Sequence, residues 1–180
     1  MFTDENLYEH FWNGEKIAAD ELVHRHGDIL VLFLNSYVKD IHEAEDLMIE
    51  AFALMFVKRR PVSEDGSFRA YLYKTARRLA GKAIKKHRIH IGLEELPFEL
   101  PGEVLADTNL FENERKKQLY EAMEELKQEY QEALYLVYLE DMSYRDTAEV
   151  MGRSESQIKN LVNRGKKSLK EILGKNGFEY

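Results

Sequence analysis

Residues 141–170 read DMSYRDTAEVMGRSESQIKNLVNRGKKSLK, and this stretch predicts two helices joined by a tight turn. Ser143 is followed three residues later by Asp146, and Ser154 by Gln157, and both pairs have the spacing of a capping box that begins a helix. Gly152 lies between them, and glycine can close a helix in the left-handed conformation without steric cost. We therefore expect helices over residues 144–151 and 155–173, with the spacing of a helix-turn-helix unit.

The second of these helices is expected to have an apolar face and a basic face. The apolar residues recur at helical spacing and are Ile158, Leu161, Val162, Gly165, Leu169, Ile172 and Leu173. Asparagine and glutamine can bind base edges, and lysine and arginine can hold phosphates. The candidate DNA contacts are Arg153, Ser154, Ser156, Gln157, Lys159, Asn160, Asn163, Arg164, Lys166 and Lys167. A helical hairpin with a solvated basic face is the alternative, but the turn spacing favours DNA binding.

Composition places the chain among soluble, helix-rich proteins. Its 180 residues allow one large domain or two small ones, and 44% are hydrophobic while 33% are charged. The absence of cysteine excludes disulfides and cysteine-based zinc sites and is compatible with a reducing compartment. We find no signal-peptide pattern at the N-terminus and no apolar run long enough for a membrane span. We therefore expect a cytoplasmic protein without membrane insertion.

The net charge of −7 conceals two basic segments in an otherwise acidic chain. Residues 58–90 hold eleven Lys and Arg against two Asp and Glu, and residues 153–175 hold seven against two. By contrast, residues 1–57 and 91–135 carry twelve acidic residues each. Local potential, rather than whole-chain charge, decides where phosphates bind, so this layout predicts two DNA-contacting surfaces.

Apolar periodicity predicts that the rest of the chain is also helical. The expected helices cover residues 7–12, 15–37, 42–57, 67–86 and 110–140. Residues 61–66 are expected to form a loop, and prolines, glycines and glutamates mark residues 91–109 as an acidic linker. The predicted fold is therefore all-α, with small helical domains over residues 1–90 and 110–180.

The predicted helix over residues 67–86 has a basic face that also carries Tyr71 and Tyr73. Aromatic rings among cations suit single-stranded DNA, because bases stack on rings while the cations follow the backbone. A solvated basic helix with half-buried tyrosines explains the same pattern, and the residues of this stretch alone leave both interpretations open.

The sequence lacks the common motifs of catalysis and of metal binding. Glu21 and His24 have the spacing of a metal-binding carboxylate–imidazole pair, but the sequence has no second copy of it. Gly-rich phosphate loops and the G-x-S-x-G and H-E-x-x-H motifs do not occur. We therefore expect no enzyme, no metal site and no cofactor.

Three motifs in order resemble the sigma-70 family of RNA polymerase sigma factors, in its small extracytoplasmic-function (ECF) class. AEDLMIEAF at residues 44–52 resembles the helix that binds core polymerase, and FRAYLYKTARR at residues 68–78 resembles the helix of the same domain that meets the −10 element. EYQEALYLVYLEDMSYRDTAEVMG at residues 129–152 resembles the start of region 4, which binds the −35 element. The resemblance therefore implies two helical domains, called region 2 and region 4.

The resemblance also implies a function and its residues. A sigma factor binds core RNA polymerase, directs it to promoters with −35 and −10 elements and assists melting. The implied polymerase contacts are Glu45, Asp46, Leu47, Ile49 and Glu50. The implied −10 contacts are Arg60, Ser67, Phe68, Arg69, Tyr71, Lys74, Arg77, Arg78 and Lys82, and the −35 contacts are those named above. The resemblance further implies that the protein has an anti-sigma partner and acts as a monomer.

Some positions depart from the family pattern and keep alternatives open. Ile49 and Leu161 replace a common Gln and a frequent Arg, which would suit a sigma-like decoy that sequesters an anti-sigma factor. A stand-alone helix-turn-helix regulator is a third possibility, although the sequence shows no heptad seam for dimerisation. Lys127 and Gln128 replace the proline that usually precedes region 4, so the helix over residues 110–140 is expected to be continuous.

Overall fold

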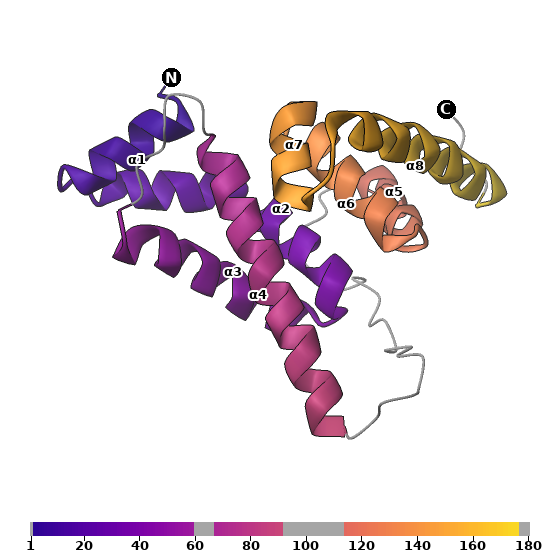
Figure 1. Ribbon diagram of the computed structural model, residues 1–180, viewed down its shortest axis with the longest axis horizontal. Helices are drawn as coiled ribbons and strands as arrows, with labels where there is room; N and C mark the ends of the chain where they lie inside the picture. Colours follow the sequence, from indigo (N-terminus) through magenta and orange to yellow (C-terminus); the bar gives the residue numbers. More distant parts are fainter. Residues whose placement is uncertain (1, 60–66, 92–113, 177–180) are drawn as a thin grey trace. The chain divides into compact units, whose positions relative to one another are not determined.

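The computed structural model describes residues 2–59, 67–91 and 114–176 (Figure 1). The regular elements in these ranges are all helices, and the chain divides into two compact units, Met1–Leu100 and Pro101–Tyr180. The predicted all-α fold with two helical domains is thereby confirmed. Apart from residue 91, the predicted linker over residues 91–109 lies outside the described residues.

The first unit consists of α1 (Asp4–Trp12), α2 (Ile17–Val38), α3 (Ile41–Val57) and α4 (Phe68–Ile91). Local signals set several of the helix ends. Thr3 accepts a hydrogen bond from the N–H of Asn6 at the start of α1, and Lys39 closes α2 in the left-handed conformation with φ of 57°. Asp40 then caps α3 by accepting a hydrogen bond from the N–H of Glu43.

Helix α4 continues past its predicted end at residue 86. His87 lies on this extension, and its Nε2 is 3.3 Å from a carboxylate oxygen of Glu43 on α3. The helix ends at Ile91, directly before Gly92 in the sequence. A tertiary contact therefore supports a turn that apolar periodicity did not include.

The core of the first unit forms around α2, which contacts α1, α3 and α4 (Figure 1). Leu22, Leu30 and Phe33 on α2 are fully buried. Tyr73 on α4 is also fully buried, with its ring centroid 5.0 Å from that of Phe33. The placement of Tyr73 on the basic face was therefore wrong, because packing against α2 turns this ring into the core.

The second unit consists of α5 (Glu114–Glu124), α6 (Gln128–Leu134), the π-helix η1 (Tyr135–Leu139), α7 (Tyr144–Met151) and α8 (Glu155–Lys175). The predicted continuous helix over residues 110–140 was wrong, because it breaks between α5 and α6. Lys127 has an extended backbone, with ψ of 139°, and Leu126 is buried at the break. Burying Leu126 compensates for the interrupted helical hydrogen bonds.

The π-helix η1 leads from α6 into the turn before α7. The N–H of Met142 donates to the carbonyl of Leu136 over 3.0 Å, while Asp141 has a φ of 51°. Burial, with smaller contributions from Tyr120 and Glu124, raises the pKa of Tyr135 well above its usual range, so this phenol stays neutral. The hydrogen bond between Met142 and Leu136 ties the start of α7 to the packed core, in which Leu136 is buried.

None of the helices in the described ranges combines the length and apolarity that crossing a membrane requires.

Candidate functional site

The helix-turn-helix unit has the predicted boundaries, and local caps hold both of its helices. At the start of α7, Ser143 accepts a hydrogen bond from the N–H of Asp146 and donates one to its carboxylate. Helix α7 ends at Gly152, which has a φ of 64°. At the start of α8 the capping box is complete: Ser154 accepts from the N–H of Gln157, and Gln157 accepts from the N–H of Ser154 over 2.9 Å. The start of α8 is therefore well defined.

The predicted DNA contacts all lie on the exposed side of this unit. Arg153, Ser154, Ser156, Gln157, Lys159, Asn160, Asn163, Arg164, Lys166 and Lys167 are exposed. The opposite face packs inward as predicted, with Ile158 and Val162 fully buried and Leu161 only 9% exposed. Leu161 stands where the family frequently has Arg. Because its side chain is buried, it contributes to packing of the core and adds no surface contact.

Not every predicted contact is equally available for DNA. The oxygens of Ser154 and Gln157 serve the capping box, although the amide NH₂ of Gln157 can still donate to a base. Arg153 has a guanidinium nitrogen 3.4 Å from a carboxylate oxygen of Glu129. Lys159, Asn160 and Asn163 follow the cap along the exposed face of α8 and are the best placed for base edges and phosphates.

A close crossing of α6 and α8 holds this face in place. Gly165 on α8 faces Tyr130 and Leu134 on α6, and a Cβ atom added to Gly165 would lie 3.2 Å from Tyr130 Cβ and Leu134 Cδ1. That distance is shorter than ordinary van der Waals contact, so a Cβ atom at this position would require its neighbours to shift by a few tenths of an ångström.

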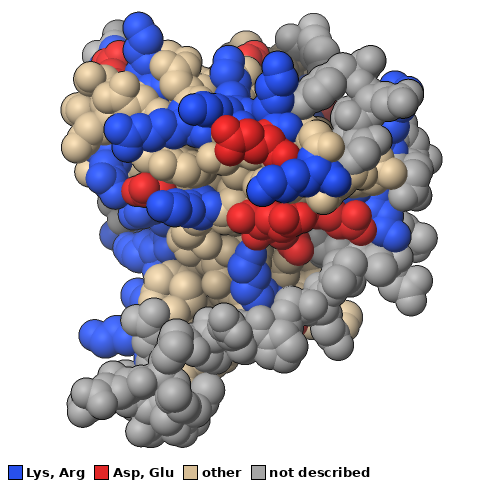
Figure 2. Space-filling model, turned by 90° about the vertical axis from the view of Figure 1, so that its right-hand side faces the viewer, with Lys and Arg blue, Asp and Glu red and all other residues tan. Residues whose placement is uncertain are grey.

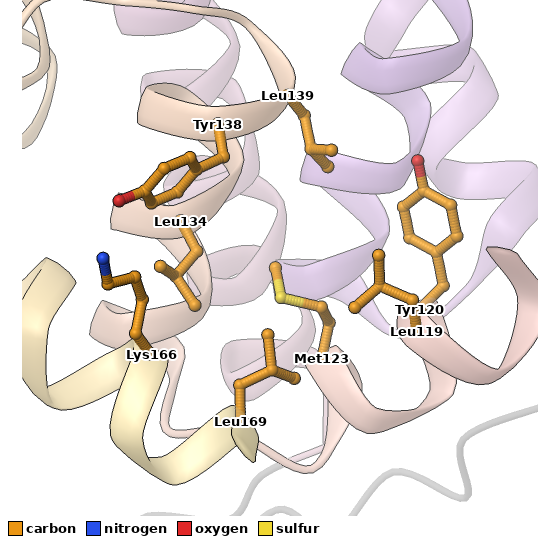
Figure 3. Close-up of a pocket in the computed structure, with 8 residues that line it drawn as sticks. All are labelled: Leu119, Tyr120, Met123, Leu134, Tyr138, Leu139, Lys166 and Leu169. Carbon is orange, nitrogen blue, oxygen red and sulfur yellow. The ribbon is translucent and has the colours of Figure 1, made fainter. Parts of the chain in front are cut away.

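An apolar pocket of about 230 Å³ opens beside α8 (Figure 3). The side chains around it come from α5, α6, η1 and α8 and are Leu119, Tyr120, Met123, Leu134, Tyr138, Leu139, Lys166 and Leu169. The ammonium of Lys166 lies 5.6 Å from the ring centroid of Tyr138, in a cation–π contact. Lys166 therefore stands between the basic face and the pocket, a position that the sequence pattern did not reveal.

The basic face of α4 keeps most of its predicted residues. Lys74, Arg78 and Lys82 are exposed, whereas Ser67, Arg69, Tyr71 and Arg77 are partly exposed. Phe68 is fully buried, with its ring centroid 5.3 Å from that of Tyr8, so its prediction as a DNA contact was wrong. Ser67 caps the helix by accepting a hydrogen bond from the N–H of Ala70, and Arg60 lies outside the described residues.

An acidic and apolar stripe runs along the exposed side of α3. Glu45, Asp46 and Glu50 are exposed there, and Ile49 is 61% exposed. Leu47 is buried in the core, so its prediction as a surface contact was wrong. Leu54 and Val57 were not predicted as contacts, yet they are also exposed and continue the stripe at helical spacing from Glu50.

Candidate metal ligands do not converge in the described part of the chain. Glu21, which sequence spacing paired with His24, instead has its carboxylate 2.8 Å from Nε of Arg25 on the next turn of α2.

Comparison with known proteins places both helical units in one family. A model of the family described as Sigma-70 region 2 matches residues 22–89, and one described as Sigma-70, region 4 matches residues 116–169. The chain therefore belongs to the sigma-70 family. Among its curated relatives, it is 27% identical to the ECF RNA polymerase sigma factor SigM of Bacillus subtilis over 168 residues, which cover 88% of this chain and 97% of that protein.

Two further comparisons agree with this assignment. The chain is 26% identical to the ECF RNA polymerase sigma factor SigE of Mycolicibacterium smegmatis over 89% of its own length but 63% of that protein's. Its fold resembles the sigma factor RpoE of Bartonella quintana, solved with the anti-sigma factor NepR, with a TM-score of 0.64 and 20% identity over 86% of this chain and 95% of that one. Within the sigma-70 family, the protein belongs to the ECF class.

Proposed function

We propose that this protein is a transcription initiation factor that binds core RNA polymerase, directs it to promoters by recognising −35 and −10 elements, and assists melting. It performs no chemistry of its own, acts in the cytoplasm as a monomer, and needs no cofactor. The observation that carries the proposal is the presence, in one sigma-70 family chain, of both a capped helix-turn-helix unit and an exposed acidic-apolar stripe on α3.

The −35 element is bound by α8. Its N-terminal end enters the major groove of duplex DNA, where Lys159, Asn160 and Asn163 reach base edges and phosphates. The capping box and the close crossing with α6 support this role, since both hold the basic face in a fixed position before DNA arrives.

The −10 element is bound by the exposed side of α4. The partly exposed ring of Tyr71 gives an extruded base a stacking surface, while Lys74, Arg78 and Lys82 contact the backbone. Extruding a base costs a few kcal/mol, which stacking of about 1–3 kcal/mol per base and cation contacts can return.

Core polymerase is bound by the stripe on α3. Exposed Ile49, Leu54 and Val57 provide apolar surface that water solvates poorly, and the carboxylates of Asp46 and Glu50 beside them can pair with basic groups and steer association. We further propose that an anti-sigma factor holds the protein inactive by covering these same surfaces. The structurally similar RpoE was solved in complex with an anti-sigma factor.

Run-off transcription tests the proposed function. The protein is added to bacterial core polymerase with genomic promoter fragments, and promoter-specific transcripts are expected. Absence of transcripts together with retained anti-sigma binding would favour the decoy interpretation, whereas specific operator binding without polymerase would favour a stand-alone regulator.

A charge reversal on α3 separates polymerase binding from DNA binding. Replacing Asp46 and Glu50 together with Arg should weaken core binding about tenfold or more, because like charges then face the basic groups of polymerase. Binding to a −35 duplex should stay within about twofold of wild type. Asp28→Arg, an exposed position on α2, is the matched control for added positive charge. Unchanged core binding by the double variant would remove α3 from the polymerase interface.

A further inference from the structure

Helix α1 lies before the region 2 match, which begins at residue 22, and its apolar side is firmly packed. Tyr8 is fully buried, and its hydroxyl donates to the carbonyl of Met55 near the end of α3 over 3.0 Å. The ring of Phe11 lies 4.6 Å from that of Phe56, measured between centroids. The helix is therefore a fixed part of the first unit.

The acidic side of α1 reaches the end of α3 and the start of α4. The carboxylate of Glu9 pairs with the guanidinium of Arg59, two residues after α3 ends. Glu5 Oε1 accepts a hydrogen bond of 3.1 Å from the N–H of Phe68, the first residue of α4. Asp4 Oδ2 lies 3.5 Å from Nε of Arg69. One short helix thus ties down two points that lie nine residues apart in the sequence.

The contacts of α1 with the start of α4 lie beside residues that are expected to bind the −10 element. Tyr71 belongs to the proposed −10 contacts, and the family resemblance implies Ser67 and Arg69 as well. Glu5 and Asp4 hold the turn of α4 that carries these residues. Holding this turn of α4 in advance removes conformational entropy that DNA binding would otherwise have to remove. Charge-assisted hydrogen bonds of this kind are among the stronger polar contacts in proteins.

We propose that α1 is a positioning element for −10 recognition, in which Glu5 and Glu9 hold the start of α4 and the end of α3 in the arrangement that binds the melted strand. This inference rests on the proposed function in promoter opening. Neither glutamate contacts DNA; each acts through the residue that it holds.

The test uses holoenzyme formed from the full chain and a promoter fragment with 2-aminopurine in the non-template strand of the −10 element. Glu5→Ala combined with Glu9→Ala should lower promoter opening about fivefold. The ratio of opening on the intact promoter to opening on a promoter with a substituted −10 element, called the −10 ratio, should fall by about the same factor. General destabilisation would reduce opening on both fragments alike and leave that ratio unchanged. Core binding should stay within about twofold of wild type.

Conservative variants distinguish positioning from competition. Glu5→Gln keeps a side-chain oxygen that can accept the hydrogen bond from Phe68, so opening close to wild type is expected. If the carboxylate of Glu9 instead competed with DNA phosphates for Arg59, both Glu9→Gln and Glu9→Ala would raise opening. Asp20→Ala combined with Asp28→Ala removes two exposed charges of the same unit on α2 and should have no effect.

Folding of each variant is checked by the fluorescence of Trp12, the single tryptophan of the chain. Should the double variant fail to fold, Glu9→Ala alone, which keeps the Glu5 contact, is expected to lower opening and the −10 ratio about twofold. A −10 ratio equal to wild type in the folded Ala variants would overturn the positioning role. Failure of wild-type holoenzyme to open any promoter fragment would instead overturn the proposed function.

Discussion

Asp4 begins α1 and shows how one residue joins three helices. Its carboxylate lies 3.2 Å from Arg25 and 3.0 Å from His26 on α2, and 3.5 Å from Arg69 on α4. Burial acts to raise the pKa of Asp4, but hydrogen bonds from His26 and Arg25 and the charges of His26 and Arg69 outweigh burial and hold that pKa below its usual value. The ionised form is therefore stabilised by folding.

Replacing Asp4 with Asn should lower the free energy of unfolding of the first unit by about 1–3 kcal/mol near neutral pH, because buried His26 and the partly exposed Arg25 and Arg69 lose a charged acceptor. A carboxylate whose pKa is lowered by folding stabilises the protein above the pKa of the unfolded chain, about 4, and that contribution is lost as pH falls through the folded value. The difference between wild type and Asp4→Asn should therefore shrink below about pH 4.

Urea unfolding followed by Trp12 fluorescence measures this difference at about pH 5 and about pH 2.5. Asp28→Asn, at an exposed position on α2, is the control and should change the free energy of unfolding by less than about 0.5 kcal/mol. A difference for Asp4→Asn that stays constant down to the lower pH would show that its charge does not stabilise the fold.

At the level of elements, the crossing of α6 and α8 depends on Gly165. Alanine at this position would gain about 0.5–1 kcal/mol from helix propensity, whereas overpacking typically costs about 1–3 kcal/mol. The neighbouring Tyr130 Cβ is bonded to the backbone of α6 and cannot move alone, so the steric cost should win. We expect Gly165→Ala to destabilise the second unit by about 1 kcal/mol.

The effect should appear in the thermal transition followed by far-UV circular dichroism, while Trp12 fluorescence, which reports the first unit, stays unchanged. Gly174→Ala is the matched control, because it lies in the same helix with no atom within 4 Å of the added Cβ. It should leave stability unchanged or raise it by up to about 1 kcal/mol. Equal effects of the two substitutions would mean that the crossing accommodates a methyl group.

Elements with local signals could be predicted from the sequence, whereas those set by tertiary contacts could not. Ser143 and Ser154 are the N-caps directly before α7 and α8. Their capping hydrogen bonds span three residues, and the helix boundaries agree closely with the prediction. The break after α5 depends on burying Leu126, and the burial of Tyr73 depends on Phe33 of another helix. The contacts of α1 with α4 join residues more than sixty positions apart, which no periodicity encodes.

The same division holds for the candidate site. The basic face of α8 follows directly from helical spacing, and all ten residues predicted to contact the −35 element are exposed. Phe68 and Leu47 occur within family motifs that also contain surface residues, and only their burial separates core from contact. Ile49 of the α3 stripe was predicted, whereas Leu54 and Val57 were missed, because they look like core residues in a pattern of apolar letters.

At the scale of the whole molecule, an acidic protein must bind a polyanion through local basic surfaces. Figure 2 shows one face of the molecule, on which Lys and Arg side chains surround a smaller group of Asp and Glu side chains. The net charge of −7 should slow association with DNA in low salt, yet contact depends on the potential of the basic faces. The salt dependence of binding therefore counts the cations that reach phosphates, whatever the total charge.

Lys167 on the exposed face of α8 is expected to contact a phosphate of the −35 duplex. Lys167→Ala should weaken binding alike on matched and mismatched duplexes and flatten the slope of log K against log salt by about 0.9, the value for one lost phosphate contact. Lys166→Ala should give the same change, because an exposed cation–π contact of about 0.5–1 kcal/mol is too weak to keep its ammonium on Tyr138. Lys175→Ala, at the far end of α8, should leave the slope unaltered. Duplex titrations of the full chain at several salt concentrations measure all three, and a wild-type slope for Lys167→Ala would place that lysine outside the DNA interface.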